Sequence, residues 1–335
     1  MKILIHCNLP FSFTHGGLQT QIEQTKLALE KIGVETEWLR WWDEKQTGDV
    51  LHFFGRMSSV QIQMVRQNGM KVVMAELLTA QGSRSPSQLW LQRTMNAAVA
   101  RFAPGYFSAA FNWKSYQLAD ACIALTPWEA HLMNYLFNAP KERTYVVPNG
   151  VEEIFFEPLE SVRGKWLVCT ATITERKRVL ELARAAVRAQ TPVWIIGNPY
   201  ADTDAYGRNF SRFARENPAF IRYEGSIGDR AQLAKIYREA RGFVLLSAME
   251  SLSLSALEAA ACGCPLLLSD LPWARETFGE QANYCPVTAP ERMAGFLKKF
   301  YTAAPSLKSL AKPLTWIDVA QQLKTVYERV LNTSR

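Results

Sequence analysis

Residues 242–265 read GFVLLSAMESLSLSALEAAACGCP, and this stretch is the most informative part of the chain. It opens with six residues that are mostly apolar, which is typical of a buried parallel strand. The residues after Ser253 favour a helix, which the closing glycine and proline would end. Glu250 therefore falls in the loop after a strand, and Glu258 lies about one turn inside the helix that follows.

This arrangement predicts an anion site. Ligands of open α/β sheets bind at the carboxyl ends of the strands, and the free N–H groups of a helix's first turn attract phosphate. The backbone at Ser253 and Leu254 would hold the anion, while Glu250 and Glu258 would accept hydrogen bonds from hydroxyl groups. A ligand with a sugar, a diphosphate and a ribose in a row would use all of these groups. The alternative is an ordinary helix in which Glu250 only complements the helix dipole and Glu258 faces solvent.

The composition is that of a globular protein with room for two domains. The chain has 335 residues, of which 48% are hydrophobic and 21% are charged. Its six cysteines stand in apolar contexts, and the close pair Cys262 and Cys264 lacks the spacing of a metal-binding knuckle. This usage indicates buried thiols in a reducing compartment. The sequence shows no secretory signal and no membrane span, so we expect a cytoplasmic protein.

The formal net charge of +7 is unevenly placed. No Asp or Glu occurs from residue 77 to residue 119, where basic residues alternate with aromatic ones. The basic residues concerned are Arg84, Arg93, Arg101 and Lys114. The pattern fits contact with the anionic inner face of a membrane through residues 84–116. Nucleic acid is a less favoured partner, and the plain alternative is aromatic residues in the core with basic residues in solvent.

Strand and helix patterns alternate through both halves of the chain, which predicts two doubly wound parallel sheets. The turn Pro148-Asn-Gly150 and the irregular stretch after it indicate a linker. We therefore predict one Rossmann-like domain over residues 1–158 and a second over residues 159–312, facing each other across a cleft. Residues 313–335 have apolar positions at helical spacing and predict a final amphipathic helix.

With these landmarks, the chain resembles the retaining glycosyltransferases of the GT-B fold, and most closely glycosyltransferase family 4. The resemblance spans nearly the whole length. It is carried by the two glutamates with seven residues between them, Gly16-Gly17 after the first strand, the segment VVPNGV at 146–151, and the loop that contains Lys177. The resemblance implies that the first domain binds the acceptor, that the second binds the donor, and that the last helix crosses back to the first domain.

The resemblance also implies roles for the matching residues. Glu258 would bind the ribose hydroxyls of a nucleotide, Glu250 the transferred sugar, and the backbone at Ser253 and Leu254 the diphosphate. Lys177 would neutralise the departing nucleoside diphosphate, which makes Glu250 and Lys177 the expected catalytic pair. Further donor-binding candidates are Ser251, Gly16, Gly17, Arg176, Arg178 and Gly225, with His15 as a minor candidate.

Three places depart from the family pattern, and at one of them Gly197-Asn-Pro199 replaces a more glycine-rich turn. An arginine usually stands five positions before the lysine, and this chain has Thr172 there. Arg176 and Arg178 are the candidates to replace it. Many members carry a histidine after the fourth strand, where this chain has Glu76-Leu77, so the sugar or acceptor contact made there is open.

We thus predict a retaining glycosyltransferase that moves a sugar from a UDP- or GDP-linked donor to a hydroxyl of a glycan or lipid-linked acceptor. The expected products are cell-surface polysaccharides or glycolipids, and neither a cofactor nor a metal is expected. Two alternatives stay open: a non-enzymatic sugar-nucleotide binder, and a nucleotide-sugar epimerase with the same two-domain shape. A transferase that acts on DNA is less favoured.

Overall fold

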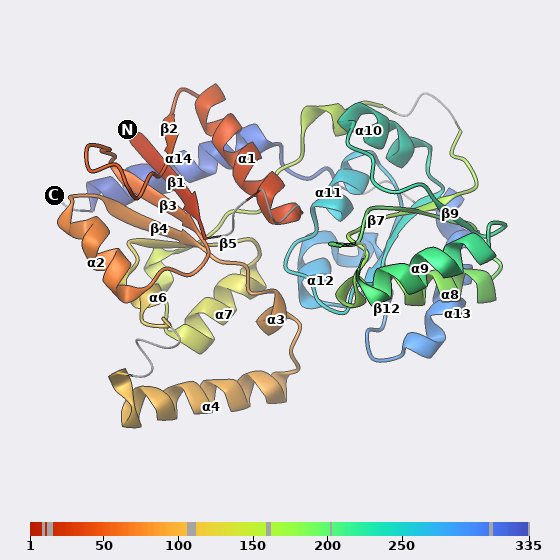
Figure 1. Cartoon of the computed structure of the whole chain (residues 1–335), viewed down its shortest axis with the longest axis horizontal. Helices are drawn as coiled ribbons and strands as arrows, with labels where there is room; N and C mark the ends of the chain where they lie inside the picture. Colours follow the sequence, from red (N-terminus) through yellow and green to blue (C-terminus); the bar gives the residue numbers. More distant parts are fainter. Residues whose placement is uncertain are drawn as a thin grey trace. The chain divides into compact units, whose positions relative to one another are not determined.

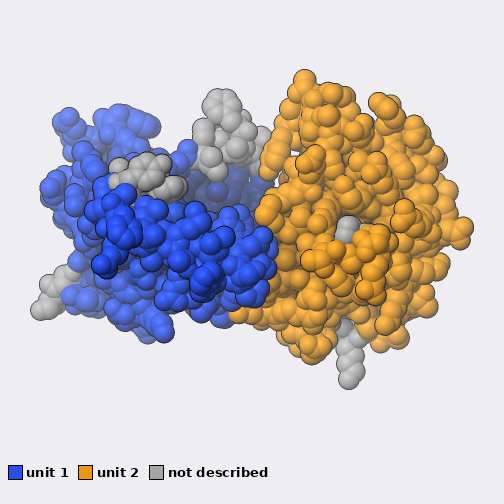
Figure 2. Space-filling model, turned by 90° about the horizontal axis from the view of Figure 1, so that it is seen from below, with its two compact units in different colours: residues 1–149, 316–335 blue, residues 150–315 orange. Residues whose placement is uncertain are grey.

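The computed structural model describes residues 1–8, 11, 16–105, 112–158, 162–201, 203–307 and 311–333. It contains two compact units, formed by residues 1–149 with 316–335 and by residues 150–315 (Figure 2). Within the described residues, each unit is built on one sheet of six strands, and the strand pairs are parallel. The predicted class of two doubly wound α/β domains is confirmed.

In the first unit the strands follow the order β2-β1-β3-β4-β5-β6. They are β1 (Lys2–Cys7), β2 (Glu35–Trp38), β3 (Val50–Phe54), β4 (Lys71–Ala75), β5 (Ala121–Ala124) and β6 (Thr144–Val146). The helices are α1 (Gly17–Lys31), α2 (Ser59–Gln67), α3 (Thr79–Gly82), α4 (Pro86–Phe102), α6 (Ser115–Leu118), α7 (Pro127–Phe137) and α14 (Trp316–Asn332). The last helix, α14, packs on α1 and thus returns to the first unit as expected (Figure 1).

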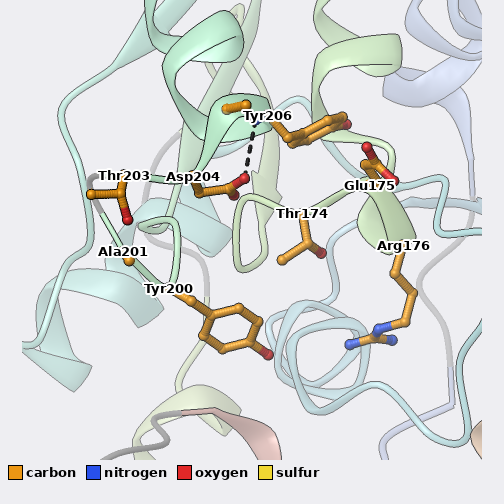
Figure 3. A pocket seen from close by; sticks show the side chains of 9 residues that line it. Thr174, Glu175, Arg176, Tyr200, Ala201, Thr203, Asp204 and Tyr206 are labelled. Carbon is orange, nitrogen blue, oxygen red and sulfur yellow. Dashed lines mark hydrogen bonds between the residues drawn. The ribbon is translucent and has the colours of Figure 1, made fainter.

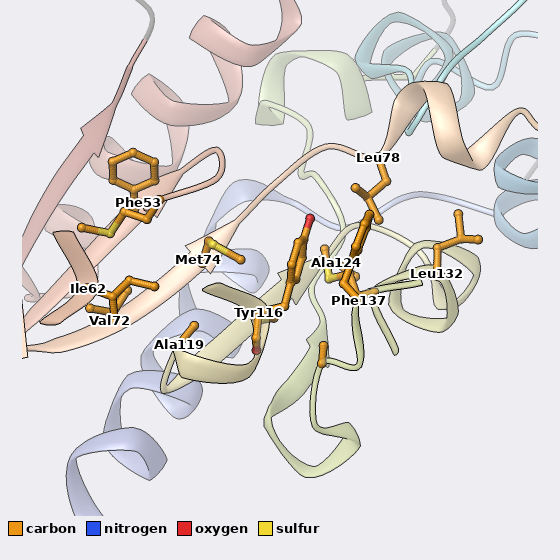
Figure 4. Close-up of a cluster of buried hydrophobic side chains, with 14 of the residues drawn as sticks. Phe53, Ile62, Val72, Met74, Leu78, Tyr116, Ala119, Ala124, Leu132 and Phe137 are labelled. Atoms are coloured by element: carbon orange, nitrogen blue, oxygen red, sulfur yellow. The ribbon is translucent and has the colours of Figure 1, made fainter. Parts of the chain in front are cut away.

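The core of the first unit lies where β3, β4 and β5 meet α2, α6 and α7 (Figure 4). Tyr116 stacks on Phe137 with ring centroids 4.7 Å apart, and both rings are fully buried. Burying a ring of this size contributes about 2 kcal/mol. Tyr116 is the last residue of the segment 84–116, and its burial fits the alternative in which aromatic residues of this segment lie in the core.

In the second unit the strands follow the order β12-β11-β10-β7-β8-β9. They are β7 (Leu167–Thr170), β8 (Val193–Ile196), β9 (Ile221–Tyr223), β10 (Gly242–Leu245), β11 (Leu266–Ser269) and β12 (Asn283–Cys285). The helices are α8 (Val179–Arg188), α9 (Ala205–Glu216), α10 (Arg230–Glu239), α11 (Leu254–Ala261), α12 (Pro272–Phe278) and α13 (Met293–Ala303). The chain order reverses between β7 and β10, so the loops after these two strands flank the switch point at which such sheets bind ligands.

The join between the units lies at Asn149–Gly150, nine residues before the predicted boundary at 158. The physical reason is the short 3-10 helix Glu153–Phe156, whose buried Phe155 packs with Tyr237 of the second unit at a centroid distance of 6.0 Å. This segment had been taken for a linker without regular structure. The second unit ends at Thr315, three residues after the predicted end at 312.

Candidate functional site

The loops after β7 and β10 bring two cations to one carboxylate. Lys177 Nζ and Arg176 Nη1 both donate to Oε1 of Glu250, the arginine over 3.3 Å. Arg176 Nη1 also donates to the carbonyl oxygen of Met249 over 2.9 Å. Glu250 is only 8% exposed. Because a carboxylate taken this far out of water needs opposite charge, the pairing explains how these side chains are held together.

Short-range hydrogen bonds fix the loop that carries the cations. Thr174 begins the 3-10 helix Glu175–Lys177, and its hydroxyl accepts the N–H of Lys177 over 3.4 Å. The carbonyl oxygen of Arg176 accepts the N–H of Ala248 over 2.8 Å, which ties this loop to the loop after β10. The positions of both cations relative to Glu250 are therefore set by the backbone.

The second predicted arginine, Arg178, is directed elsewhere. Its backbone is left-handed, with φ 51°, and its guanidinium donates to the carbonyl oxygen of Val287 over 2.8 Å. The resembled family usually has an arginine where this chain has Thr172. Of the two candidates to replace it, the structure brings Arg176, and not Arg178, to the Glu250 carboxylate that Lys177 also binds.

The start of α11 lies directly after this loop. Ser253 is the N-cap of the helix, and its buried hydroxyl accepts the N–H of Ala256 over 3.4 Å. The same hydroxyl lies 3.1 Å from that of Ser255. Leu254 is the first helical residue, and Ser251 lies in the loop before the cap. A serine cap satisfies one N–H of the first turn and leaves the positive end of the helix for an anion.

Glu258 lies on α11 and is 5% exposed. Its Oε1 accepts a hydrogen bond from Arg230 Nη2 over 2.6 Å, and its Oε2 accepts one from the Tyr237 hydroxyl over 3.3 Å. Arg230 also binds Glu152, through Nε over 2.9 Å and through Nη2. Burial raises the pKa of Glu258, and Arg230 opposes this rise. The sequence analysis missed Arg230 and Glu152, because no spacing rule links residues so far apart in the chain.

Two glycines shape the neighbouring strand ends. Gly225 follows β9 with φ +85°, and its carbonyl oxygen accepts the N–H of Gly197 over 3.0 Å. Gly197 follows β8 with φ +146°, and a Cβ at this position would overlap the carbonyl oxygen of Ala171. Gly197 is thus required by space as well as by backbone angle. Gly225, a predicted donor-binding residue, belongs to the same carboxyl edge of the sheet.

An open hollow of about 520 Å³ borders Arg176 (Figure 3). It is lined by residues 174–176 after β7 and by residues of the segment 200–206 that leads into α9. Asp204 is the N-cap of α9 and accepts the N–H of Tyr206 over 3.0 Å. Arg176 therefore stands between this hollow and the Glu250 carboxylate.

In the first unit, Gly16 is the N-cap of α1 and Gly17 its first residue. A Cβ at Gly16 would meet no atom within 4 Å. The two glycines thus stand at the start of a helix, and their binding of an anion stays a prediction. His15, the minor candidate, lies outside the described residues.

A polar network that the sequence analysis missed lies at the carboxyl ends of β3 and β4. Arg56 binds both oxygens of Glu76 through Nε and Nη2, each over 2.8 Å. The hydroxyl of the buried Tyr116 also donates to Glu76. Glu76 stands next to Leu77, where many members of the resembled family carry a histidine. That position is thus filled by a leucine, and the carboxylate beside it is already bound to an arginine and a tyrosine.

The remaining predictions concern metals, thiols and the membrane. In the part of the chain that the structure describes, no three His, Cys, Asp or Glu side chains are grouped as a metal site would require. The six cysteines form no disulfide, and burial raises the pKa of the Cys122, Cys169 and Cys264 thiols to about 12. None of the described helices combines the length and the apolar character needed to span a bilayer.

Comparison with known proteins finds a family model and a relative that are both described as glycosyltransferases. Residues 164–302 match the family described as glycosyl transferases group 1. Over 244 residues the chain is 30% identical to the D-inositol 3-phosphate glycosyltransferase of Jonesia denitrificans, and the match covers 62% of this chain and 57% of that relative.

Solved structures match over almost the whole chain. The sucrose-phosphate synthase of Thermosynechococcus elongatus has a TM-score of 0.72 at 17% identity, and the match covers 99% of each chain. HepE of Anabaena, in complex with UDP and glucose, has a TM-score of 0.64 at 13% identity, again with 99% of each chain covered. These structures share the fold of this chain.

Proposed function

We propose that this chain transfers a sugar from a nucleoside-diphosphate sugar to a hydroxyl group, on the premise that residues 164–302 are a glycosyl transferases group 1 domain within a GT-B fold. The observation that carries the proposal is the cluster of Lys177, Arg176 and Glu250 beside the capped start of α11, at the switch point of the second sheet. It offers cations for a diphosphate and a carboxylate for sugar hydroxyls at the place where such sheets bind ligands.

The chemistry follows from where charge develops. As the bond from the sugar to the diphosphate breaks, negative charge grows on the departing phosphate. Lys177, Arg176 and the start of α11 stabilise that charge, and stabilisation of this kind usually lowers a reaction barrier more than any other single effect. Glu250, released from the cations, accepts hydrogen bonds from the sugar, and Glu258 accepts those of the ribose. These groups supply the positive charge themselves, so we propose a site that works without a metal or other cofactor.

We further propose that the transfer retains the configuration of the sugar and that the acceptor binds the first unit. Among the described residues of that unit, the carboxylate that follows β4 is Glu76, and Arg56 and Tyr116 already occupy it. A carboxylate held in this way is poorly placed to act as the general base that an inverting reaction needs. The acceptor we propose is a hydroxyl of a glycan or a lipid-linked glycan of the cell surface.

UDP-sugars are the first donors to test, because HepE, which shares the fold, was solved with UDP. The wild-type protein and two variants, Lys177→Ala and Glu250→Gln, are assayed for donor binding by thermal shift and for donor hydrolysis or transfer. Lys235→Ala is the matched control, since Lys235 lies in the same unit and is 69% exposed. Turnover in Lys177→Ala equal to that of the control would remove the proposed role of the lysine.

The same assays separate the alternatives. Tight donor binding without turnover on a panel of acceptors favours a non-enzymatic sugar-nucleotide binder. Formation of an epimer from the donor alone favours an epimerase. Failure to bind either UDP-sugars or GDP-sugars contradicts the proposal as a whole.

We propose a second, separate property, contact of α4 with an anionic membrane surface. The helix carries exposed apolar side chains: Trp90 (62% exposed), Leu91 (54%), Met95 (58%) and Phe102 (81%). Figure 1 shows α4 at the rim of the first unit. Arg84, Arg93 and Arg101 flank this stripe, and the absence of acidic residues from 77 to 119 favours an anionic surface.

Vesicle cosedimentation tests this contact. We expect the protein to bind phosphatidylglycerol vesicles and to bind phosphatidylcholine vesicles more weakly. Leu91→Ser and Phe102→Ser should each reduce the bound fraction, whereas Trp42→Ser should not, although Trp42 is 80% exposed. Trp42 is followed directly by Asp43 and Glu44, which makes it a matched exposed ring beside acidic residues. Equal binding by all variants would contradict the proposal.

A further inference from the structure

Arg230 stands between two carboxylates of the second unit. Its Nη2 lies 2.6 Å from Glu258 Oε1, and its Nε lies 2.9 Å from Glu152 Oε2. The Glu258 side chain is 7% exposed and that of Glu152 is 21% exposed. One guanidinium therefore serves two carboxylates, of which Glu258 is the more deeply buried.

The surroundings of Arg230 fix its side chain. It is the first residue of α10, and the N-cap Asp229 accepts the N–H groups of Ala231 and Gln232 over 2.9 and 3.2 Å. The guanidinium carbon lies 4.7 Å from the ring centre of Phe155. A planar guanidinium that lies over a ring loses little freedom when it binds a carboxylate. The geometry thus sets the direction in which Glu258 points.

The charge of Glu258 also depends on Arg230. The titratable groups that act on this carboxylate are Arg230 and Tyr237 of α10 and Glu152, and Cys262 follows at the end of its own helix. Burial raises the pKa of Glu258, Glu152 adds to the rise, and Arg230 is the one cation among these described groups that opposes it. Without that cation, Glu258 would hold a proton over a wider range of pH.

We propose that Arg230 is a positioning residue for donor recognition. It keeps Glu258 a charged carboxylate that is directed at the ribose hydroxyls. Glu152 competes with Glu258 for the same guanidinium. The inference rests on the proposed function, since it assigns the ribose to Glu258. A carboxylate accepts hydrogen bonds from both ribose hydroxyls, whereas a protonated carboxyl group has one oxygen occupied by its own proton. The consequence is discrimination between ribonucleotides and 2′-deoxyribonucleotides.

The probes are UDP and dUDP, with GDP and dGDP as a second pair, measured by calorimetry on the intact chain. The readout is the ratio of the Kd of the deoxy form to that of the ribo form, in which titration of the phosphates cancels. We expect a wild-type ratio of about ten or more, the value of a hydrogen bond to a charged group. In Arg230→Gln the ratio should fall towards one and should fall further as the pH is lowered, because the variant's Glu258 has lost the cation that opposes its protonation.

Two further variants control the experiment. Glu152→Gln removes a carboxylate from Arg230 but leaves Glu258 paired, so its ratio should equal or exceed that of the wild type. Arg230→Lys keeps the positive charge but lacks the planar pair of N–H donors, so it should give an intermediate ratio. This variant replaces Arg230→Gln in the test if Arg230→Gln does not fold.

The outcomes are distinct. If Arg230→Gln weakens the ribo and deoxy forms by the same factor, or leaves both unchanged, the positioning role is overturned while the proposed function stands. If the wild type binds the ribonucleotides with a ratio near one, the assignment of the ribose to Glu258 is overturned together with the role of Arg230. If the wild type binds none of the four nucleotides, the proposed function and this inference both fail.

Discussion

Acid should destabilise the first unit through one histidine. His52 lies in β3, is 1% exposed, and stacks on Phe54 with ring centroids 4.2 Å apart. Its Nδ1 lies 2.7 Å from the hydroxyl of Tyr327 on α14, and its Nε2 has no hydrogen-bond partner among the described residues. Burial lowers the pKa of His52 from 6.5 to about 3. The ring is therefore neutral in the folded protein at any pH near neutrality.

The size of the effect follows from the two pKa values. The unfolded chain takes up a proton at His52 below pH 6.5, whereas the folded chain resists protonation until about pH 3. The stability is fully present above pH 6.5 and is lost as the pH falls. Each pH unit in this window costs about 1.4 kcal/mol of the free energy of unfolding. Between pH 7 and pH 5 the expected loss is about 2 kcal/mol.

The assay is urea unfolding of the wild type and of the double variant His52→Phe with Tyr327→Phe, at several pH values. The double variant removes the titrating ring together with its partner, so no buried hydroxyl is left unpaired. The difference in unfolding free energy between the two proteins should shift by about 2 kcal/mol from pH 7 to pH 5, since the other titrating groups are common to both. Tyr327→Phe alone keeps the histidine and should keep the slope. A difference that does not change with pH would refute the reasoning.

Three further expectations concern single side chains. Lys177→Ala should lower turnover by about 10²- to 10³-fold in a transfer assay, yet cost only about 1 kcal/mol in urea unfolding, because a second cation still binds the carboxylate. Gly197→Ala should lower the unfolding free energy by about 3 kcal/mol, since its Cβ would overlap the carbonyl oxygen of Ala171. The control Gly228→Ala adds a Cβ that meets no atom within 4 Å, and it should change the unfolding free energy by less than about 0.5 kcal/mol. Equal effects of the two variants in thermal unfolding would contradict this. Glu129→Gln should cost about 1–3 kcal/mol, because the buried carboxylate accepts two backbone N–H groups over 2.6 and 2.8 Å and an amide cannot replace both acceptor oxygens; full wild-type stability would exclude that role.

The sequence predicted the regular elements well where local pattern determines them. The clearest local signals belong to β1, β4 and α10, because a buried parallel strand is a continuous apolar run and α10 has clear helical spacing. Helix α9 has a weak signal in the sequence, since its glycine and polar residues weaken the helical pattern and its stability comes from packing against α8. The three-residue β12 is too short to show a period.

The candidate site was predictable only in part. The sequence indicates Glu250 and Lys177 because each comes shortly after an apolar run that predicts a strand. It indicates Glu258 because this residue lies in the helix that follows Glu250. The cation pairing of Glu250 depends on β7 lying beside β10, and this follows from the strand order of the folded sheet. Arg230 and Glu258 are 28 positions apart in the chain, and their contact likewise follows from the folded arrangement. The exposure of an aromatic residue is equally a property of packing, as the buried Tyr116 and the exposed Phe102 show.

The charges of the second unit bear on the orientation of the donor that we propose it binds. At Glu250, two cations meet one carboxylate, which leaves a formal charge of +1. At Glu258, one guanidinium meets two carboxylates, which leaves a formal charge of −1. A diphosphate is attracted to the first cluster, and the hydroxyl donors of a ribose to the second. Since Glu250 precedes α11 and Glu258 lies on it, a nucleotide held at this helix has one favourable orientation, with its phosphates at the start of the helix and its ribose along it. The reverse orientation would place the phosphates against Glu152 and Glu258, where like charges repel.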